Sequence, residues 1–330
     1  MGVVYEADQV QLGRAVALKV LDARPGQVSA HNIDQRFLRE ASLLSRLSHP
    51  NTVRVFDYGV EEGRPYLVME LIRGPTLRKL LQQGPLDPLR AVRIAWQVCG
   101  SLQEAHHAGV IHRDLKPANV LVTKAPDGSD RVKVVDFGLV KEIQGATEMT
   151  ADGLILGTPQ FMAPEQIRSL PLDQRCDVYA MGVLLFKCLT GSYPHPQGDP
   201  TSVLMAHLKQ APQTLAGAGV DLPGTLQWTL DRCLAKDRDE RFIDARELQR
   251  ALRLCEAALL DEATATLAHP VLIDGRIDLP DPTPTARGWA LRGGLLIVGL
   301  VALTATMFLG LAAGYLLVRQ VAPWLMEMTW

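Results

Sequence analysis

Cysteine is scarce in this sequence, and the few cysteines lack the spacing of a metal site. The five cysteines are scattered along 330 residues with no Cys-x-x-Cys pair. We therefore expect reduced, buried thiols of a cytosolic domain, not a disulfide framework or a zinc site. The eight histidines include no His-x-x-x-His pair, which argues against a metal held by histidine. A net charge of -2 gives no support for binding to nucleic acid.

The start of the chain lacks a basic segment followed by an apolar core, so no signal peptide is predicted. Alternating apolar residues instead predict strands over 1–7, 15–21, 52–58 and 65–71. A helix is predicted over 34–48, because apolar residues recur there at helical spacing, namely Phe37, Leu38, Ala41, Leu44 and Leu47. Further helices are expected over 77–81, 86–108, 202–210, 223–234 and 244–260.

One stretch in the middle of the chain places an acid, a base and an amide in a short loop. It reads His112-Arg113-Asp114-Leu115-Lys116-Pro117-Ala118-Asn119, and apolar residues follow it at once. A second apolar strand leads directly into Asp136-Phe137-Gly138. Two strands joined as a hairpin would present Asp114, Asn119 and Asp136 at one edge. Oxygen-bearing side chains gathered in this way suit Mg²⁺ and a phosphoryl group.

These motifs resemble the catalytic loop and the metal-binding triplet of protein kinases. The resemblance covers about Gly2 to Leu260 and implies an α+β, two-lobed kinase fold, with a small β-rich N-lobe over 1–72 and a larger helical C-lobe over 73–260. Lys116, two residues after the aspartate, is similar to the serine/threonine-specific subgroup. The implied activity is that of a bacterial, eukaryotic-like kinase that transfers the γ-phosphate of ATP, with Mg²⁺, to Ser or Thr of protein substrates.

The resemblance implies a role for each residue of the loop. Asp114 would accept the proton of the substrate hydroxyl, and Lys116 would neutralise charge on the transferred group. Asn119 and Asp136 would hold Mg²⁺. The spine that links the two lobes is expected to consist of Leu44, Val55, His112 and Phe137.

The nucleotide site implied by the resemblance lies mostly in the N-lobe. Lys19 looks like the strand lysine that holds the α- and β-phosphates, and Glu40 would be its partner because an unpaired buried charge is costly. Met69 would be the gatekeeper in front of the hinge. The residues expected at ATP are Gly2, Val4, Ala17, Lys19, Glu40, Met69, Glu70, Ile72 and Leu121. The apolar members of this set could equally be plain core residues.

The family's Gly-x-Gly-x-x-Gly-x-Val loop survives only as Gly2 and Val4. We expect that Met1 is an internal methionine taken as the start, or that the chain is a fragment. The incomplete loop motivates an alternative, a pseudokinase that binds nucleotide as a scaffold without turnover. A third reading is a small-molecule kinase of related fold, which the Ala163-Pro164-Glu165 motif disfavours.

The segment over 138–162 is expected to control activity through autophosphorylation. Thr150 is the candidate phosphosite, because a phosphothreonine there would pair with Arg113, although an ordinary loop threonine is equally compatible. Thr158 is expected to be a structural hydroxyl near the catalytic loop. By resemblance, Glu165 would be paired with Arg241 in the core, and Asp177 would bind the backbone of the catalytic loop.

The carboxy-terminal part changes character. Residues 261–292 contain several prolines and threonines and are predicted to be a juxtamembrane linker. Residues 293–318 carry no charge and, at about 1.5 Å per residue, would span roughly 39 Å, enough to cross a bilayer. More arginines precede this run than follow it, which predicts a single-pass protein of the cell membrane with a cytoplasmic kinase domain and a short outer tail over 319–330. Gly310 and Gly314 would allow two such helices to pack, so a homodimer is one expectation.

Overall fold

The computed structural model describes residues 2–21, 30–138, 158–196 and 198–267. The chain divides into two units, residues 1–267 and 268–330, and all of the described residues belong to the first. Thr150, most of the predicted linker and the predicted membrane segment over 293–318 lie outside the described residues. Among the helices that the structure does describe, none has both the length and the apolar character needed to span a bilayer.

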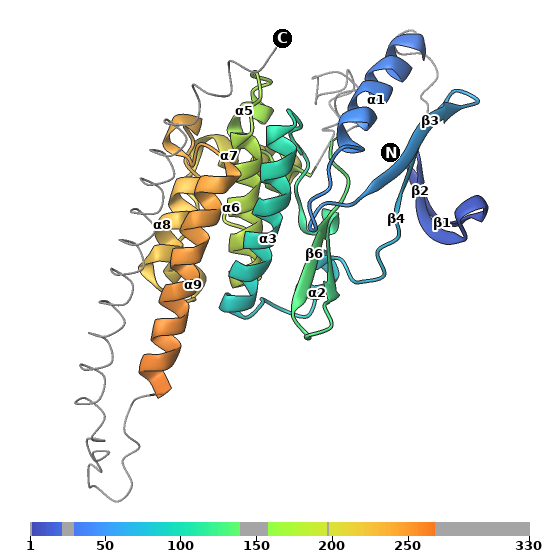
Figure 1. The fold of residues 1–330 in the computed structure, drawn as a ribbon. Helices are drawn as coiled ribbons and strands as arrows, with labels where there is room; N and C mark the ends of the chain where they lie inside the picture. Colours follow the sequence, from blue (N-terminus) through green and yellow to red (C-terminus); the bar gives the residue numbers. More distant parts are fainter. Residues whose placement is uncertain (1, 22–29, 139–157, 197, 268–330) are drawn as a thin grey trace, which may run out of the picture. The chain divides into compact units, whose positions relative to one another are not determined.

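In the residues described, the N-lobe is a four-stranded antiparallel sheet with one α-helix (Figure 1). Its strands follow the order β1-β2-β4-β3, with bounds Val3–Gln9, Arg14–Val20, Arg64–Glu70 and Val55–Glu61. Helix α1 spans Ala30–Leu44 and packs against β3 and β4. Its apolar face is buried at Phe37, Ala41 and Leu44, as the helical spacing predicted.

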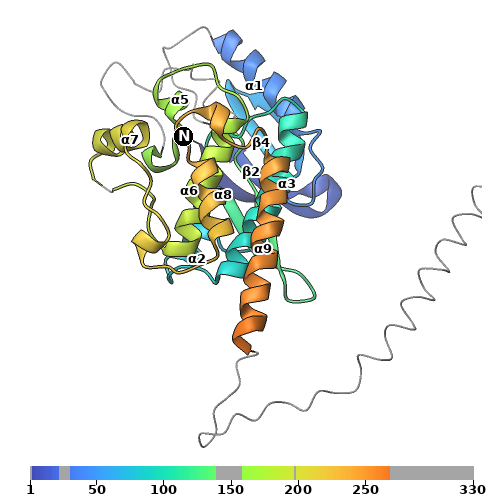
Figure 2. The same ribbon diagram turned by 90° about the vertical axis from the view of Figure 1, so that its left-hand side faces the viewer.

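The C-lobe is built around helix α6, Arg175–Thr190, which is buried along almost its whole length. Figure 2 shows α6 among the other long helices, and α3 and α8 contact it directly. Besides α6, the α-helices of this lobe that the structure describes are α2 Leu77–Leu81, α3 Pro88–His107, α5 Pro164–Ile167, α7 Pro200–Lys209, α8 Gly224–Cys233 and α9 Ala245–Leu267. A hairpin of β5, Val120–Lys124, and β6, Asp130–Val134, lies beside α3.

Local sequence explains where the principal helices begin and end. Asp87 caps α3 by accepting a hydrogen bond from the Arg90 N–H, with a proline at the first helical turn. Asp199 caps α7 in the same way through the N–H of Ser202. Helix α6 ends at Thr190 and is capped by Gly191, whose φ of 73° is favourable for glycine.

Three predicted elements differ from the structure by more than two residues at one or both ends. Strand β3 begins at Val55 and not at residue 52, because residues 51–53 pair with β6 instead: Val53 N–H donates to the Val134 carbonyl. Helix α1 begins earlier and ends at Leu44, since the backbone N–H groups of Ser48 and His49 turn to the Glu104 carboxylate. Helix α9 continues to Leu267, so the linker does not begin at 261; no Gly or Pro interrupts residues 261–267.

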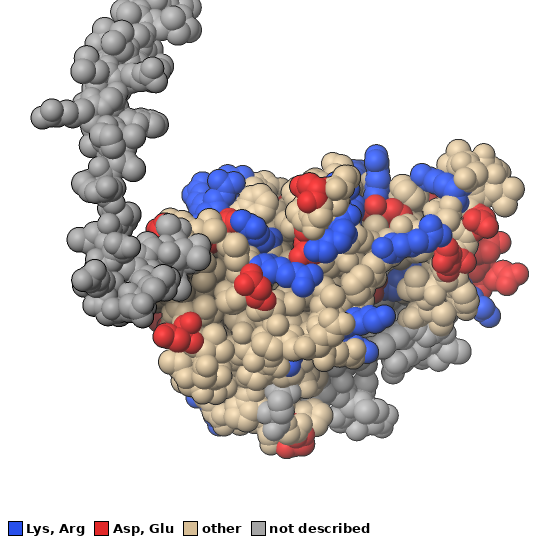
Figure 3. All heavy atoms as spheres, turned by 90° about the horizontal axis from the view of Figure 1, so that it is seen from below, with Lys and Arg blue, Asp and Glu red and all other residues tan. Residues whose placement is uncertain are grey.

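The face of the molecule seen in Figure 3 carries both signs of charge. Lys and Arg side chains are interspersed there with Asp and Glu over the described residues. That view therefore shows no continuous field of one sign on the described part of this face.

Candidate active site

The catalytic loop gathers the predicted acid, cation and amide around one carboxylate. Lys116 Nζ lies 2.6 Å from Asp114 Oδ2. Asn119 Nδ2 donates to the Asp114 carbonyl at 2.9 Å and lies 3.3 Å from its Oδ2. A 3-10 turn, η2 over Pro117–Asn119, buries the asparagine and turns it back toward Asp114. The three residues that the sequence proposed as catalytic are therefore in direct contact.

Asp177, at the first turn of α6, holds the loop from beneath. Its two carboxylate oxygens accept the backbone N–H groups of His112 at 2.8 Å and Arg113 at 2.9 Å, and His106 Nε2 lies 2.8 Å away. Burial acts to raise the pKa of this carboxyl, but His106 and the backbone donor outweigh it, so the pKa is lowered. The anionic Asp177 can thus hold Arg113 in its left-handed conformation, φ 60°.

Asp136 follows β6 at the same end of the hairpin at which Asn119 precedes β5. Val120 pairs with Val134, and the Val135 N–H donates to the Asn119 carbonyl at 2.9 Å. This register brings the two predicted magnesium ligands to one end of the sheet, as the hairpin argument required.

Lys19, on β2, reaches this edge from the N-lobe, with its Nζ 2.7 Å from Asp136 Oδ1. Glu40 lies half-buried on α1, and its pairing with Lys19 stays a prediction. The ion pair joins the predicted phosphate-binding lysine to a predicted metal ligand across the two lobes.

Gly138 closes the metal-binding triplet in a position that only glycine fits. Its N–H donates to the His112 carbonyl at 3.1 Å, and an added Cβ would lie 2.7 Å from that oxygen. Gly2 is similar, since a Cβ there would lie 2.3 Å from the Val20 carbonyl oxygen. Both glycines are required by close backbone approach.

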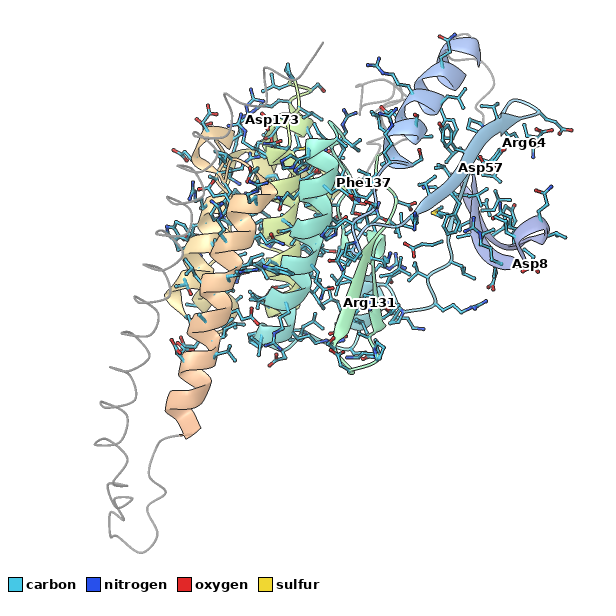
Figure 4. The ribbon with its side chains drawn as sticks, in the orientation of Figure 1. Asp8, Asp57, Arg64, Arg131, Phe137 and Asp173 are labelled. Carbon is cyan, nitrogen blue, oxygen red and sulfur yellow. The ribbon has the colours of Figure 1, made fainter. Side chains whose placement is uncertain are left out.

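Phe137 links the catalytic loop to the N-lobe (Figure 4). Its ring centroid lies 4.7 Å from that of His112. Phe137 also lines a small pocket together with Leu44 and Val55, which are further members of the predicted spine. Lys19 and Asp136 line the same pocket, which therefore adjoins their ion pair.

The residues expected around adenine are only partly brought together. Ala17 and Met69 are paired in the sheet and share a small buried cluster with Val53. Leu121 is partly buried on β5 and bridges to Thr76, while Val4 on β1 is 55% exposed.

Of the predicted hinge residues, Glu70 ends β4 and Ile72 follows it, and the structure adds a contact that the sequence did not predict. The Glu70 carboxylate accepts the Arg54 N–H at 2.8 Å and forms an ion pair with Lys133 of β6. Lys133 also donates to the Thr52 carbonyl at 3.1 Å. The sequence gave no sign of this ion pair between the lobes, because Lys133 is only one polar residue in a strand of alternating apolar and polar residues.

The residues that follow the segment over 138–162 are anchored in the core. Glu165 and Arg241 are both buried and form a two-pronged ion pair, with N–O distances of 2.7 and 2.9 Å. Lys116 Nζ lies 3.3 Å from Thr158 Oγ1, which places this hydroxyl beside the catalytic loop. Gln166, another residue that the sequence did not single out, donates to the Arg113 carbonyl at 3.0 Å.

The fold is two-lobed and α+β, and it places Asp114, Asn119 and Asp136 at one end of the β5–β6 hairpin. This arrangement defines a site of the phosphoryl-transfer type. Residues 1–251 match the protein kinase domain, and the chain belongs to that family.

The chain is 38% identical over 268 residues to the serine/threonine-protein kinase pkn2 of Myxococcus xanthus, covering 78% of this chain and 31% of pkn2. It is 36% identical over 258 residues to PknB of Mycobacterium leprae, covering 76% of this chain and 40% of PknB. The chain thus spans well under half of the length of these two curated relatives. The solved kinase domain of Mycobacterium tuberculosis PknI is 27% identical, with a TM-score of 0.58, covering 77% of this chain and 91% of that domain.

Proposed function

We propose that this chain is a serine/threonine protein kinase that transfers the γ-phosphate of ATP to Ser or Thr hydroxyls of protein substrates. The observation that carries the proposal is the contact of Asp114 with Lys116 and Asn119, at the hairpin end that also bears Asp136. Membership of the protein kinase family and similarity to curated serine/threonine kinases support it.

The described residues can perform the steps that belong to the protein. Asp114 Oδ2 can accept the hydroxyl proton of the acceptor side chain as the new O–P bond forms and the bond from the γ-phosphorus to the bridging oxygen breaks, with ADP as the leaving group. Lys116, between Asp114 and Thr158, can offset negative charge on the transferred group while the acceptor lies against Thr158.

The family uses ATP and Mg²⁺. The carboxylate of Asp136 and the amide oxygen of Asn119 fit this requirement, since both are the hard oxygen donors that Mg²⁺ prefers. When bound, the ion would neutralise phosphate charge. Lys19 would exchange its ion pair with Asp136 for the phosphates of the nucleotide.

The scaffold alternative has less support. Lys19, Asp114, Asn119 and Asp136 are all present, and the last three lie at one end of the hairpin. A binding module without turnover would not require Lys116 to be held against Asp114.

The test is Mg²⁺-dependent transfer of radiolabelled phosphate by the full chain to itself and to myelin basic protein. Asp114→Asn is expected to lower the rate by about 10²- to 10⁴-fold, because the proton acceptor is lost. Asp127→Asn, in the exposed turn between β5 and β6, makes the same chemical change away from the site and should leave the rate unchanged. Nucleotide binding without any transfer by the unsubstituted chain would select the scaffold instead.

We further propose that residues 293–318 anchor the chain in the cell membrane with the kinase domain in the cytoplasm, and that Thr150 is autophosphorylated. The uncharged run and the arginines before it support the first statement. After an alkaline wash of membranes, the full chain should stay in the pellet and a chain ending at residue 292 should be released. Recovery of the full chain in the supernatant would contradict the anchor.

Phosphopeptide mapping of the active chain tests the second statement, with label expected at Thr150 and absent from Thr150→Ala. The same membrane preparations test a homodimer, because Gly310→Leu should abolish cross-linking between copies if the Gly-x-x-x-Gly face joins them.

A further inference from the structure

A buried glutamine joins the catalytic loop to the residues that precede helix α5. Gln166 lies in α5 and is 4% exposed. Its side-chain Oε1 accepts the backbone N–H of Ala163, and its Nε2 donates to the backbone carbonyl of Arg113, each at 3.0 Å. One buried amide group therefore binds the backbone of two segments that are far apart in the chain.

These two contacts settle which end of the amide is oxygen and which is nitrogen. The Ala163 N–H can only donate and the Arg113 carbonyl can only accept, so no other orientation satisfies both. A glutamine suits this place because its neutral side chain carries an acceptor and a donor at one end. An ionised glutamate has acceptors alone, and a methionine of similar length has no N–H to donate.

The Arg113 carbonyl belongs to a strained turn of the catalytic loop. The Asp114 N–H donates to the His112 carbonyl at 2.8 Å, and Arg113 between them has a φ of 60°. A three-residue turn of this kind with a positive φ is rare and strained. Asp177 holds the turn by accepting the Arg113 N–H, while Gln166 binds the carbonyl of the same residue. Two buried side chains thus bind both backbone polar groups of Arg113.

The peptide group that Gln166 binds leads directly into Asp114. The Arg113 carbonyl and the Asp114 N–H lie in one planar peptide unit. Gln166 fixes the oxygen of this unit, and the His112 carbonyl fixes its N–H. Because the plane is held on both sides, the direction in which the Asp114 side chain leaves the backbone is held as well.

The second segment bound by the amide runs over residues 158–163, called here the acceptor loop. Ala163 is buried at the end of this loop, directly before α5. At the other end, Thr158 Oγ1 lies 3.3 Å from Lys116 Nζ, which in turn contacts Asp114. The acceptor loop and the catalytic loop therefore meet at two places, through Thr158 and through Gln166.

We propose that Gln166 is a positioning residue for phosphoryl transfer, because its amide fixes the Asp114 carboxylate relative to the acceptor loop. The proposal rests on the proposed kinase function and deepens it. The two backbone groups that the amide binds belong to none of the residues expected at ATP. Loss of the amide should therefore slow transfer to the protein substrate and leave the binding of MgATP intact.

The experiment measures kcat with myelin basic protein and KM for MgATP, both with the full chain. The carboxylate of Gln166→Glu can still accept the Ala163 N–H but cannot donate to the Arg113 carbonyl. This variant should lower kcat about 10- to 100-fold, as expected when a reacting group is misplaced by about 1 Å, with KM for MgATP changed less than about twofold. Gln166→Met should lower kcat at least as much, since it loses both contacts.

Gln97→Glu is the matched control, because Gln97 on α3 makes the same pair of backbone contacts with β6. Its Oε1 accepts the Val132 N–H at 3.0 Å, and its Nε2 donates to the Asp130 carbonyl at 2.9 Å. The control makes the same chemical change away from the catalytic loop and should keep kcat within about twofold of that of the unsubstituted chain.

Amide hydrogen exchange gives a readout that does not depend on activity. Exchange over 112–116 should quicken in both Gln166 variants, because each loses the bond to the Arg113 carbonyl. Exchange over 158–163 should quicken only in Gln166→Met, because Gln166→Glu keeps the bond to the Ala163 N–H. Neither segment should change in Gln97→Glu.

The proposal is overturned if kcat of Gln166→Glu stays within about twofold of that of the unsubstituted chain, if KM for MgATP rises as kcat falls, or if exchange over 112–116 is unchanged. If Gln166→Met does not fold, Gln166→Glu carries the test. Failure of both variants to fold, while Gln97→Glu folds, would show a purely structural role and would also overturn it. Absence of phosphate transfer by the unsubstituted chain would refute the kinase function, whereas the exchange measurement would still decide the role of Gln166.

Discussion

The two halves of the site are held in different ways. On the C-lobe side, Asp177 is buried and binds two backbone N–H groups, and the Glu165–Arg241 pair has side chains only 5% and 0% exposed. On the N-lobe side, Lys19 forms an ion pair with Asp136, with side chains 15% and 35% exposed. The difference indicates that the proton-accepting half is built by the core before any ligand binds, while the phosphate-binding half has a contact that a nucleotide can replace.

The largest effect on stability is expected at the buried Glu165–Arg241 ion pair. Arg241→Met leaves the Glu165 carboxylate buried without its partner and should lower the free energy of unfolding by about 3–5 kcal/mol. Urea unfolding followed by fluorescence measures this loss. The double variant Arg241→Met, Glu165→Gln should lose less than Arg241→Met alone, because no lone charge is left in the core. Equal losses of unfolding free energy in the two variants would contradict the view that the unpaired buried charge of Glu165 causes the instability.

A pH titration sharpens the comparison within the C-lobe. Burial lowers the pKa of His195 to about 4 and that of His207 to about 3, below the 6.5 of a free histidine. Between pH 6.5 and about 4 the unfolded chain binds protons at these positions that the folded chain does not, so stability falls as the pH falls. Each histidine should contribute a slope of up to about 1.4 kcal/mol per pH unit.

Urea unfolding of the native chain and of His207→Gln at several pH values in this window measures that slope. The substituted chain should show the shallower dependence, since glutamine does not titrate. The same slope in both chains would show that His207 is not neutral in the folded protein.

The smallest effect is expected at an exposed ion pair between Glu6 of the N-lobe and Arg73, the first residue of the C-lobe. Arg73 Nη2 lies 2.6 Å from Glu6 Oε1, but the side chains are 73% and 60% exposed. Arg73→Ala should change the unfolding free energy by less than about 1 kcal/mol, and added salt should reduce even that. A loss of unfolding free energy comparable to that of Arg241→Met would show that short distance, and not burial, determines how much an ion pair stabilises this fold.

The parts of the site that could be predicted from sequence were those carried by local motifs. Asp114, Lys116 and Asn119 lie within one short loop, and the strand pattern on either side was sufficient to place Asp136 at the same edge. The partners of Glu165 and of the catalytic-loop backbone were also found, but through resemblance to the family and not through spacing.

The remaining contacts join single polar residues that are far apart in the chain, and none of these residues belongs to a sequence motif that would identify its partner. Lys133 meets Glu70, Gln166 meets the Arg113 carbonyl, and His207 meets Tyr179 only once the lobes are folded. The start of β3 was missed for a similar reason, because pairing of residues 51–53 with β6 outweighed their local preference for continuing β3.

A crystal structure of the full chain with Mg²⁺ and a non-hydrolysable ATP analogue tests the central claim most directly. The claim predicts that Lys116 and Asn119 keep their contacts with Asp114, while Lys19 leaves Asp136 for the phosphates and Asp136 turns to the metal. A complex in which Lys19 remains on Asp136 while the Asp114 contacts break would contradict it.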